Sequence, residues 1–173
     1  TDIIESPETF AQQGNKIFVA GDSITAGYPY LDATNQLNNS SIRWGEQLKR
    51  KYGFDVSYGA ETGGGWIYLP NPSSRNAITI ANNTDFSKYD TAVFAFGTND
   101  YGGNIPLGNV TDMYPNQQTV CGGLNYVINK VYTDNPSIVL IISTPIKRGD
   151  RGTASNNYGY GTANTEGYTL LEL

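Results

Sequence analysis

Three short motifs in this 173-residue sequence combine glycine with residues that can do chemistry. Gly-Asp-Ser at 21–23, the glycine-rich segment 59–65 and Gly-Thr-Asn-Asp at 97–100 each follow an apolar run. Ser23 can serve as a nucleophile, and a serine that attacks an ester creates an oxyanion, which needs preorganised donors about 3 Å away. The Ser23 N–H, a glycine N–H and the Asn99 amide are donors of this kind. The motifs therefore favour a serine nucleophile with an oxyanion hole.

The apolar patterns predict strands that alternate with helices along the chain. Helices joining strands make crossover connections, so we expect a parallel sheet in a three-layer α/β domain at 16–173, with 1–15 as an N-terminal arm or linker. The carboxyl ends of parallel strands share one edge, which places the three motifs together. The expected strands are 16–20, 54–58, 91–96 and 138–142, and the expected helices are 41–52, 74–81, 120–131 and one that begins near Thr165.

Composition and charge disfavour several classes of binding partner. Eleven Lys and Arg against 16 Asp and Glu give a net charge of -5, and no basic run is longer than 49–51, which disfavours nucleic acid and anionic membranes. No apolar run approaches the roughly 18 residues of a membrane span. Cys121 is the only cysteine, and we expect it to pack in a helix. Asn-rich loops and 13 tyrosines suit sugar ligands, or merely solvate long loops.

As a set, and in this order, the motifs resemble those of the SGNH (GDSL-type) hydrolases, and the resemblance covers residues 16 to about 143. It implies a flavodoxin-like parallel sheet and serine esterase activity on a small acyl ester or an O-acetylated carbohydrate. It also implies Ser23 as nucleophile, Asn99 as one oxyanion donor and Gly63 as another. Gly63 is favoured over Gly59 by its spacing from the strand. The resemblance implies no metal or organic cofactor.

Each of these residues also has a structural interpretation. Ser23 could be a turn residue or an N-cap, Gly63 could only permit a positive φ, and Asn99 could bond its own backbone in an Asx-turn. We expect Asp22 and Asp100 to support turns rather than to act as acid or base. Trp66 and Tyr68 could line a pocket or cap the core.

The general base of the family is absent from this sequence. The SGNH hydrolases supply it from an Asp-x-x-His motif after a fifth strand, and these 173 residues contain no histidine. Asp134, Asp150 and Glu166 lie on unsuitable elements or in loops. We therefore expect the domain to be incomplete at its C-terminus, without the last strand and helix, and inactive by itself. The apolar run 138–142 is typical of an interior strand, so a further C-terminal segment or another chain is expected to pair along it.

Two other functions stay open. The chain could be a catalytically inactive carbohydrate-binding or structural module that keeps the pocket without the base. A looser resemblance of the loop at 102–108 to SGNH modules of bacterial-surface or phage tail proteins implies an extracellular, cell-surface or phage-particle location. A flavodoxin-like nucleotide binder is a third option, but neither G-x-x-x-x-G-K-[ST] nor G-x-G-x-x-G follows a strand.

Overall fold

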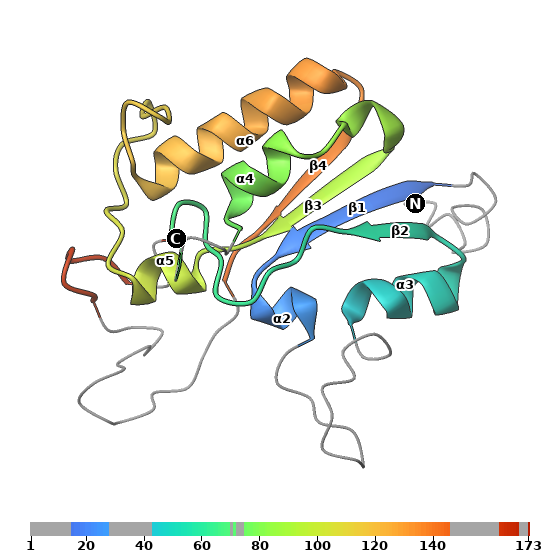
Figure 1. Cartoon of the computed structure of the whole chain (residues 1–173), viewed down its shortest axis with the longest axis horizontal. Helices are drawn as coiled ribbons and strands as arrows, with labels where there is room; N and C mark the ends of the chain where they lie inside the picture. The colour runs from blue at the N-terminus through green and yellow to red at the C-terminus, as the bar shows by residue number, and fades with distance from the viewer. Residues whose placement is uncertain (1–14, 28–42, 70, 72–74, 146–162, 170–172) are drawn as a thin grey trace, which may run out of the picture.

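A computed structural model describes residues 15–27, 43–69, 71, 75–145, 163–169 and 173, and these form a sheet with helices on both faces (Figure 1). The sheet has four strands in the order β2-β1-β3-β4, and all pairs are parallel. This arrangement confirms the expected α/β fold. The arm expected at 1–15 lies almost wholly outside the described residues. The strands are β1 (Lys16–Gly21), β2 (Asp55–Tyr58), β3 (Thr91–Ala95) and β4 (Val139–Ser143).

Helices cover the two faces unequally. Helix α3 packs along β2 on one face, and α4 and α6 pack together on the other (Figure 1). Two one-turn helices, α2 and α5, directly follow β1 and β3. The helices are α2 (Ser23–Ala26), α3 (Trp44–Tyr52), α4 (Ala77–Asn82), the 3-10 turn η1 (Phe86–Lys88), α5 (Thr98–Gly102) and α6 (Val120–Asp134). None of these helices has both the length and the apolar character needed to cross a membrane.

The core lies mainly between the sheet and the α4–α6 layer. Phe18 and Phe94 project from the two central strands and contact Phe86, with ring centroids 5.5 and 6.1 Å away. Trp66 stacks on Phe94 and is 4% exposed. A smaller cluster on the opposite face joins β1 and β2 to α3. Burial on both faces is what a central parallel strand requires, and β1 is buried from Ile17 to Gly21.

Helix α6 has the N-cap, the buried face and the C-terminal end that its sequence indicates. Thr119 is the N-cap, and its hydroxyl oxygen accepts a 3.0 Å hydrogen bond from the Gly122 N–H. Val120, Val127 and Val131 form the buried stripe expected from the helical spacing. The helix ends at Asp134, before Asn135 and Pro136, because the residue before a proline disfavours helical backbone.

Three expectations about helices differ from the structure. Helix α4 begins at Ala77, with Asn76 as its N-cap, whereas the expected helix covers 74–81. Helix α3 begins at Trp44, and residues 41–42 lie outside the described part. The helix expected from Thr165 is wrong for 165–169, which form turns. There, Asn164 donates its N–H to the Tyr168 carbonyl, and its side-chain oxygen accepts from the Glu166 N–H. Asn164 thus organises a turn in place of a helix.

Strand β4 forms an edge of the described sheet. Its apolar side chains are unusually exposed, with Val139 at 57%, Ile141 at 46% and Ile142 at 37%. A run of this composition is normally covered in a parallel sheet.

Candidate active site

Ser23 is the first residue of α2, directly above the carboxyl end of β1. Asp22 is the N-cap, and its Oδ1 accepts a 2.9 Å hydrogen bond from the Ile24 N–H. Gly27 ends the helix after one turn with a φ of 82°. The Asp22 side chain is buried at 3% exposure, whereas Ser23 is half-buried. Asp22 is therefore a capping residue, as expected, and Ser23 is left partly accessible at the edge of the sheet.

The chain after β2 runs alongside the end of β1. The Gly59 N–H donates to the Val19 carbonyl at 2.8 Å, and the Glu61 N–H donates to the Gly21 carbonyl at 2.8 Å. Gly63 follows in a tight turn with a φ of 80°, which favours glycine. Among the described residues, no hydrogen-bond partner is found for the Gly63 N–H. Both interpretations of Gly63, the positive φ and the available donor, are therefore compatible with its geometry.

Asn99 connects the loop after β3 to the loop after β2. It lies in α5, and its Nδ2 donates a 2.9 Å hydrogen bond to the Gly64 carbonyl. An amide nitrogen has two hydrogens, so one remains for a further acceptor. This bond to a distant loop differs from the Asx-turn that was the structural alternative. At the same edge, the Asp22 N–H donates a 3.3 Å hydrogen bond to the Ala95 carbonyl, which joins the ends of β1 and β3.

Asp100 holds the loop after β2 from inside the protein. It is fully buried, and its carboxylate accepts backbone N–H bonds from Trp66 at 2.7 Å, Ile67 at 2.9 Å and Tyr68 at 3.0 Å. Burial raises the pKa of the Asp100 carboxyl above its ordinary value, and the three N–H donors oppose that shift. A Cβ at Gly65 would collide with this carboxylate. The sequence suggested a supporting role for Asp100, but it gave no indication of these three partners.

The three predicted site residues thus lie in the segments that follow three neighbouring strands. Ser23 follows β1, Gly63 follows β2 and Asn99 follows β3, all at the carboxyl edge. Trp66 and Tyr68 support the same region. Trp66 is a core residue that also borders a cavity, so its two interpretations are both correct. Tyr68 packs against Gly103, just after α5.

Two of the three carboxylates considered as bases lie in described parts of the chain that are away from Ser23. Asp134 ends α6 and accepts hydrogen bonds from the Phe86 N–H and from Lys130. Glu166 is exposed in the turn at 163–169, and Asp150 lies outside the described residues. The described residues therefore place no candidate base among these three beside Ser23.

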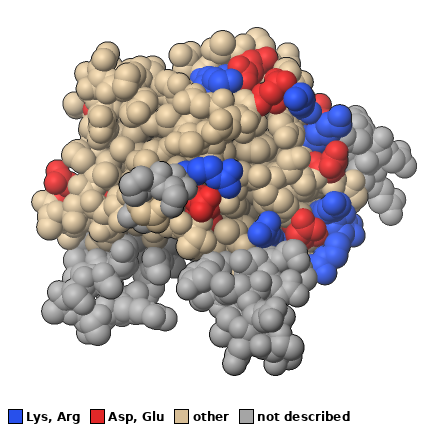
Figure 2. All heavy atoms as spheres, viewed as in Figure 1, with Lys and Arg blue, Asp and Glu red and all other residues tan. Residues whose placement is uncertain are grey.

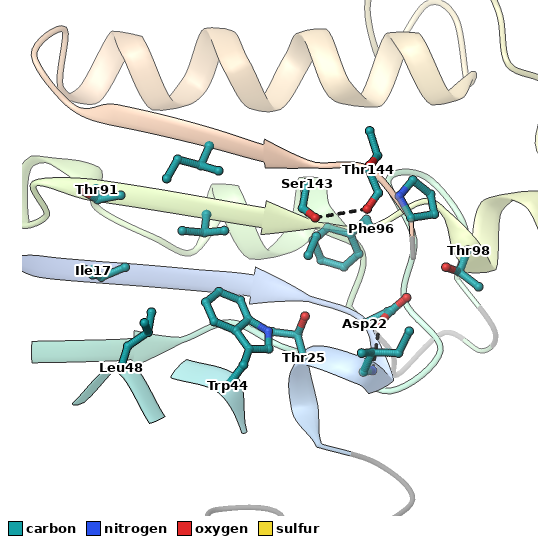
Figure 3. A pocket seen from close by; sticks show the side chains of 15 residues that line it. Ile17, Asp22, Thr25, Trp44, Leu48, Thr91, Phe96, Thr98, Ser143 and Thr144 are labelled. Carbon is teal, nitrogen blue, oxygen red and sulfur yellow. Dashed lines mark hydrogen bonds between the residues drawn. The ribbon is translucent and has the colours of Figure 1, made fainter. Parts of the chain in front are cut away.

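An apolar groove of about 500 Å³ lies on the α3 face of the sheet (Figure 3). Asp22, Thr25 and Thr98 border it at the carboxyl edge, and Ile17 and Thr91 border its far end. Trp44 and Leu48 of α3 form one wall. A second apolar cavity, of about 250 Å³, lies on the α6 side of the carboxyl edge.

No protein-family model matches the sequence, and no curated protein matches it. Solved structures do match. A "possible lipase" from Chitinophaga pinensis aligns with a TM-score of 0.63 and 26% identity, over 91% of this chain and 60% of that one. A structure described as a "putative GDSL-like lipase" from Bacteroides uniformis aligns with a TM-score of 0.61 and 16% identity. That match covers 82% of this chain and 76% of the lipase.

A family two carbohydrate esterase from Clostridium thermocellum, in complex with cellohexaose, aligns with a TM-score of 0.52 and 22% identity. That match covers 74% of this chain and 42% of the esterase. The chain therefore spans between 42% and 76% of the length of these three structures. The order β2-β1-β3-β4, the loops that converge at its carboxyl edge and these matches give the chain the fold of the SGNH (GDSL-type) hydrolases.

Proposed function

We propose that the chain carries the nucleophile and the oxyanion hole of a serine esterase that removes acyl groups, acetyl among them, from an O-acylated carbohydrate. The observation that supports this most directly is the hydrogen bond from Asn99 Nδ2 to the Gly64 carbonyl. It fixes an amide donor between the segments after β2 and β3, and β1, the strand that Ser23 follows, lies between these two strands in the sheet. Preorganised donors of this kind stabilise the charge that develops during acyl transfer.

In the proposed reaction, Ser23 Oγ attacks the acyl carbon and transfers its proton to a base. The oxyanion that forms accepts hydrogen bonds from the Ser23 and Gly63 N–H groups and from Asn99 Nδ2. Its collapse breaks the bond to the sugar oxygen, which leaves with a proton, and water then releases the acyl group from Ser23. Because the sequence contains no histidine, the base is a group other than a histidine of these 173 residues.

The carbohydrate part of the proposal is supported by the surface. In the view of Figure 2, most Lys and Arg side chains lie towards the end of the molecule where α3 ends, away from the carboxyl edge of the sheet. An uncharged, hydroxyl-rich substrate suits such a surface better than a nucleotide or an acidic polymer does. The matched carbohydrate esterase was solved in complex with cellohexaose.

The alternative is a catalytically inactive module that binds carbohydrate through the same edge. The absence of histidine is the observation that favours it. Hydrolysis and binding must therefore be measured separately.

Hydrolysis of p-nitrophenyl acetate and of an acetylated xylo-oligosaccharide, with and without added imidazole, tests the proposal. We expect imidazole to accelerate turnover by the wild-type chain and to give no such gain in Ser23→Ala. Ser137→Ala, at an exposed serine between α6 and β4, is the matched control and should behave as wild type. Equal rates for wild type and Ser23→Ala under all conditions would reject the esterase. Oligosaccharide binding that survives in Ser23→Ala would then favour the binding module.

A further inference from the structure

The cavity of about 250 Å³ is apolar and lies entirely at the carboxyl edge. Its walls come from the start of α6, the loop that follows α5, the end of β4 and the loop after β2. Residues that define it are Trp66, Phe96, Leu107, Val120, Leu124 and Ile142. Trp66, Phe96 and Val120 are each less than 5% exposed, so this side of the cavity is fixed by the core.

Two observations place the cavity next to the segments that Asn99 joins. Pro145 and Leu173 line the cavity, and they approach within 2.9 and 3.6 Å of the position of a Cβ at Gly97, the N-cap of the helix that holds Asn99. On the other side, Trp66 lies two residues after Gly64, whose carbonyl accepts from Asn99 Nδ2. The cavity therefore adjoins both loops that Asn99 joins.

The larger groove has a different course. It follows the sheet from Thr98 at the carboxyl edge to Thr91 at the beginning of β3, beneath α3 (Figure 3). Its near end is bordered by Asp22 and Ile24, on either side of Ser23, and its far end lies about the length of a strand away. The groove is therefore the competing site for an acyl chain. The compact cavity, by contrast, is confined to the carboxyl edge, where Trp66 of the loop after β2 and Phe96 at the end of β3 line it together with residues of β4 and α6.

We propose that the compact cavity binds the acyl chain of the ester, an inference that rests on the proposed esterase function of Ser23. A volume of about 250 Å³ holds about eight groups of roughly 30 Å³ each, the share of one water in the liquid. This size suits an acyl chain of about four to eight carbons, and an acetyl group fills only part of it. Each added methylene up to that length should raise kcat/KM about threefold, because the methylene leaves water for an apolar wall.

The two tryptophans of the chain report on the two spaces separately. Trp66 lines the cavity and Trp44 lines the groove. With 8-bromooctanoate as a quenching probe, we expect quenching of Trp66 fluorescence in Trp44→Phe and none of Trp44 in Trp66→Phe. Absence of quenching in Trp44→Phe overturns the proposal. So does quenching of Trp44 in Trp66→Phe. If Trp66→Phe fails to fold, quenching of Trp66 fluorescence in Trp44→Phe alone decides whether the probe binds in the cavity.

A series of p-nitrophenyl esters, measured with added imidazole as the base, tests the same cavity through activity. Wild type should prefer butyrate to octanoate esters over acetate and over palmitate. Leu124→Phe, which narrows the cavity, should lower the octanoate-to-acetate ratio of kcat/KM at least tenfold, and Leu48→Phe, in the groove, should leave it unchanged. An unchanged ratio in Leu124→Phe, or a change in Leu48→Phe, contradicts the proposal. Val120→Ile is the milder variant if Leu124→Phe does not fold. If no ester is hydrolysed, the esterase function fails, while Trp66 quenching still decides whether the cavity binds an acyl chain.

Discussion

The carboxylate of Asp100 accepts a 2.7 Å hydrogen bond from the backbone N–H of Trp66, which lies 34 residues earlier in the chain. Together with the bonds from Ile67 and Tyr68, this contact ties the loop after β2 to the helix that carries Asn99. The position of Gly63 and the position of Asn99 are therefore coupled through one buried side chain. We draw the first prediction from this coupling.

Asp100→Asn should lower the free energy of unfolding by about 1–3 kcal/mol, because the amide cannot accept three N–H bonds and turns an N–H toward a backbone donor. Urea unfolding measures the loss. The exposed Asp55, at the other end of the sheet, provides the control Asp55→Asn, which should stay within about 0.5 kcal/mol of wild type. Equal free energies of unfolding for Asp100→Asn and Asp55→Asn would show that Asp100 does not support the loop.

Asn99→Ala should reduce kcat/KM for an activated acyl ester by about a hundredfold to a thousandfold, as expected for loss of one oxyanion donor. The variant also removes the bond to the Gly64 carbonyl, so its unfolding must be measured beside its activity. Asn129→Ala, on the exposed side of α6, should retain full activity. A reduction of less than threefold in a folded Asn99→Ala would exclude Asn99 as an oxyanion donor.

The sequence predicts the sheet well because its signals are local. The apolar runs at β1, β3 and β4 each span a few adjacent residues, and the valine stripe of α6 repeats within one helix. The helices α2 and α5 were not expected, because a single turn is too short to show a period. The link from Asp100 to Trp66 is also invisible locally, since it depends on how the two loops meet in space.

The turn at 163–169 shows the opposite effect, in which tertiary contacts override a local pattern. Tyr168 is 5% exposed, donates its hydroxyl to the Ile105 carbonyl at 2.7 Å and packs edge-on against Tyr101. Burial raises the pKa of the Tyr168 hydroxyl well above its ordinary value. Docking of Tyr168 on the loop that follows α5 holds this segment in a turn where we had expected a helix.

Ile141→Lys should reduce self-association of the chain at high concentration. The side chain is 46% exposed on the edge strand β4, and exposed apolar edges favour pairing with another chain. Light scattering as a function of concentration measures the effect. Thr133→Lys adds the same charge at an exposed position of α6 and controls for net charge. If both variants reduce association equally, charge rather than the edge is responsible.

The loop that borders the compact cavity should respond to acid through Asp112. Its carboxylate accepts a 3.0 Å hydrogen bond from the Asn109 N–H and a 2.9 Å bond from the Thr119 hydroxyl. The Asn109 bond, followed by the Thr119 bond, holds the pKa of Asp112 below its ordinary value.

Because the folded pKa is lowered, the stabilising contribution of Asp112 is present above the unfolded value of about 3.9 and is lost as the pH falls through the folded pKa. An NMR titration should therefore show the Asn109 amide shifting only below about pH 3.9, with no such transition in Asp112→Asn. A transition at or above that pH would mean that these bonds do not favour the ionised carboxylate. Since Leu107 and Gly108 of the same loop line the cavity, octanoate binding should weaken over the same pH range in wild type, after correction for protonation of the ligand.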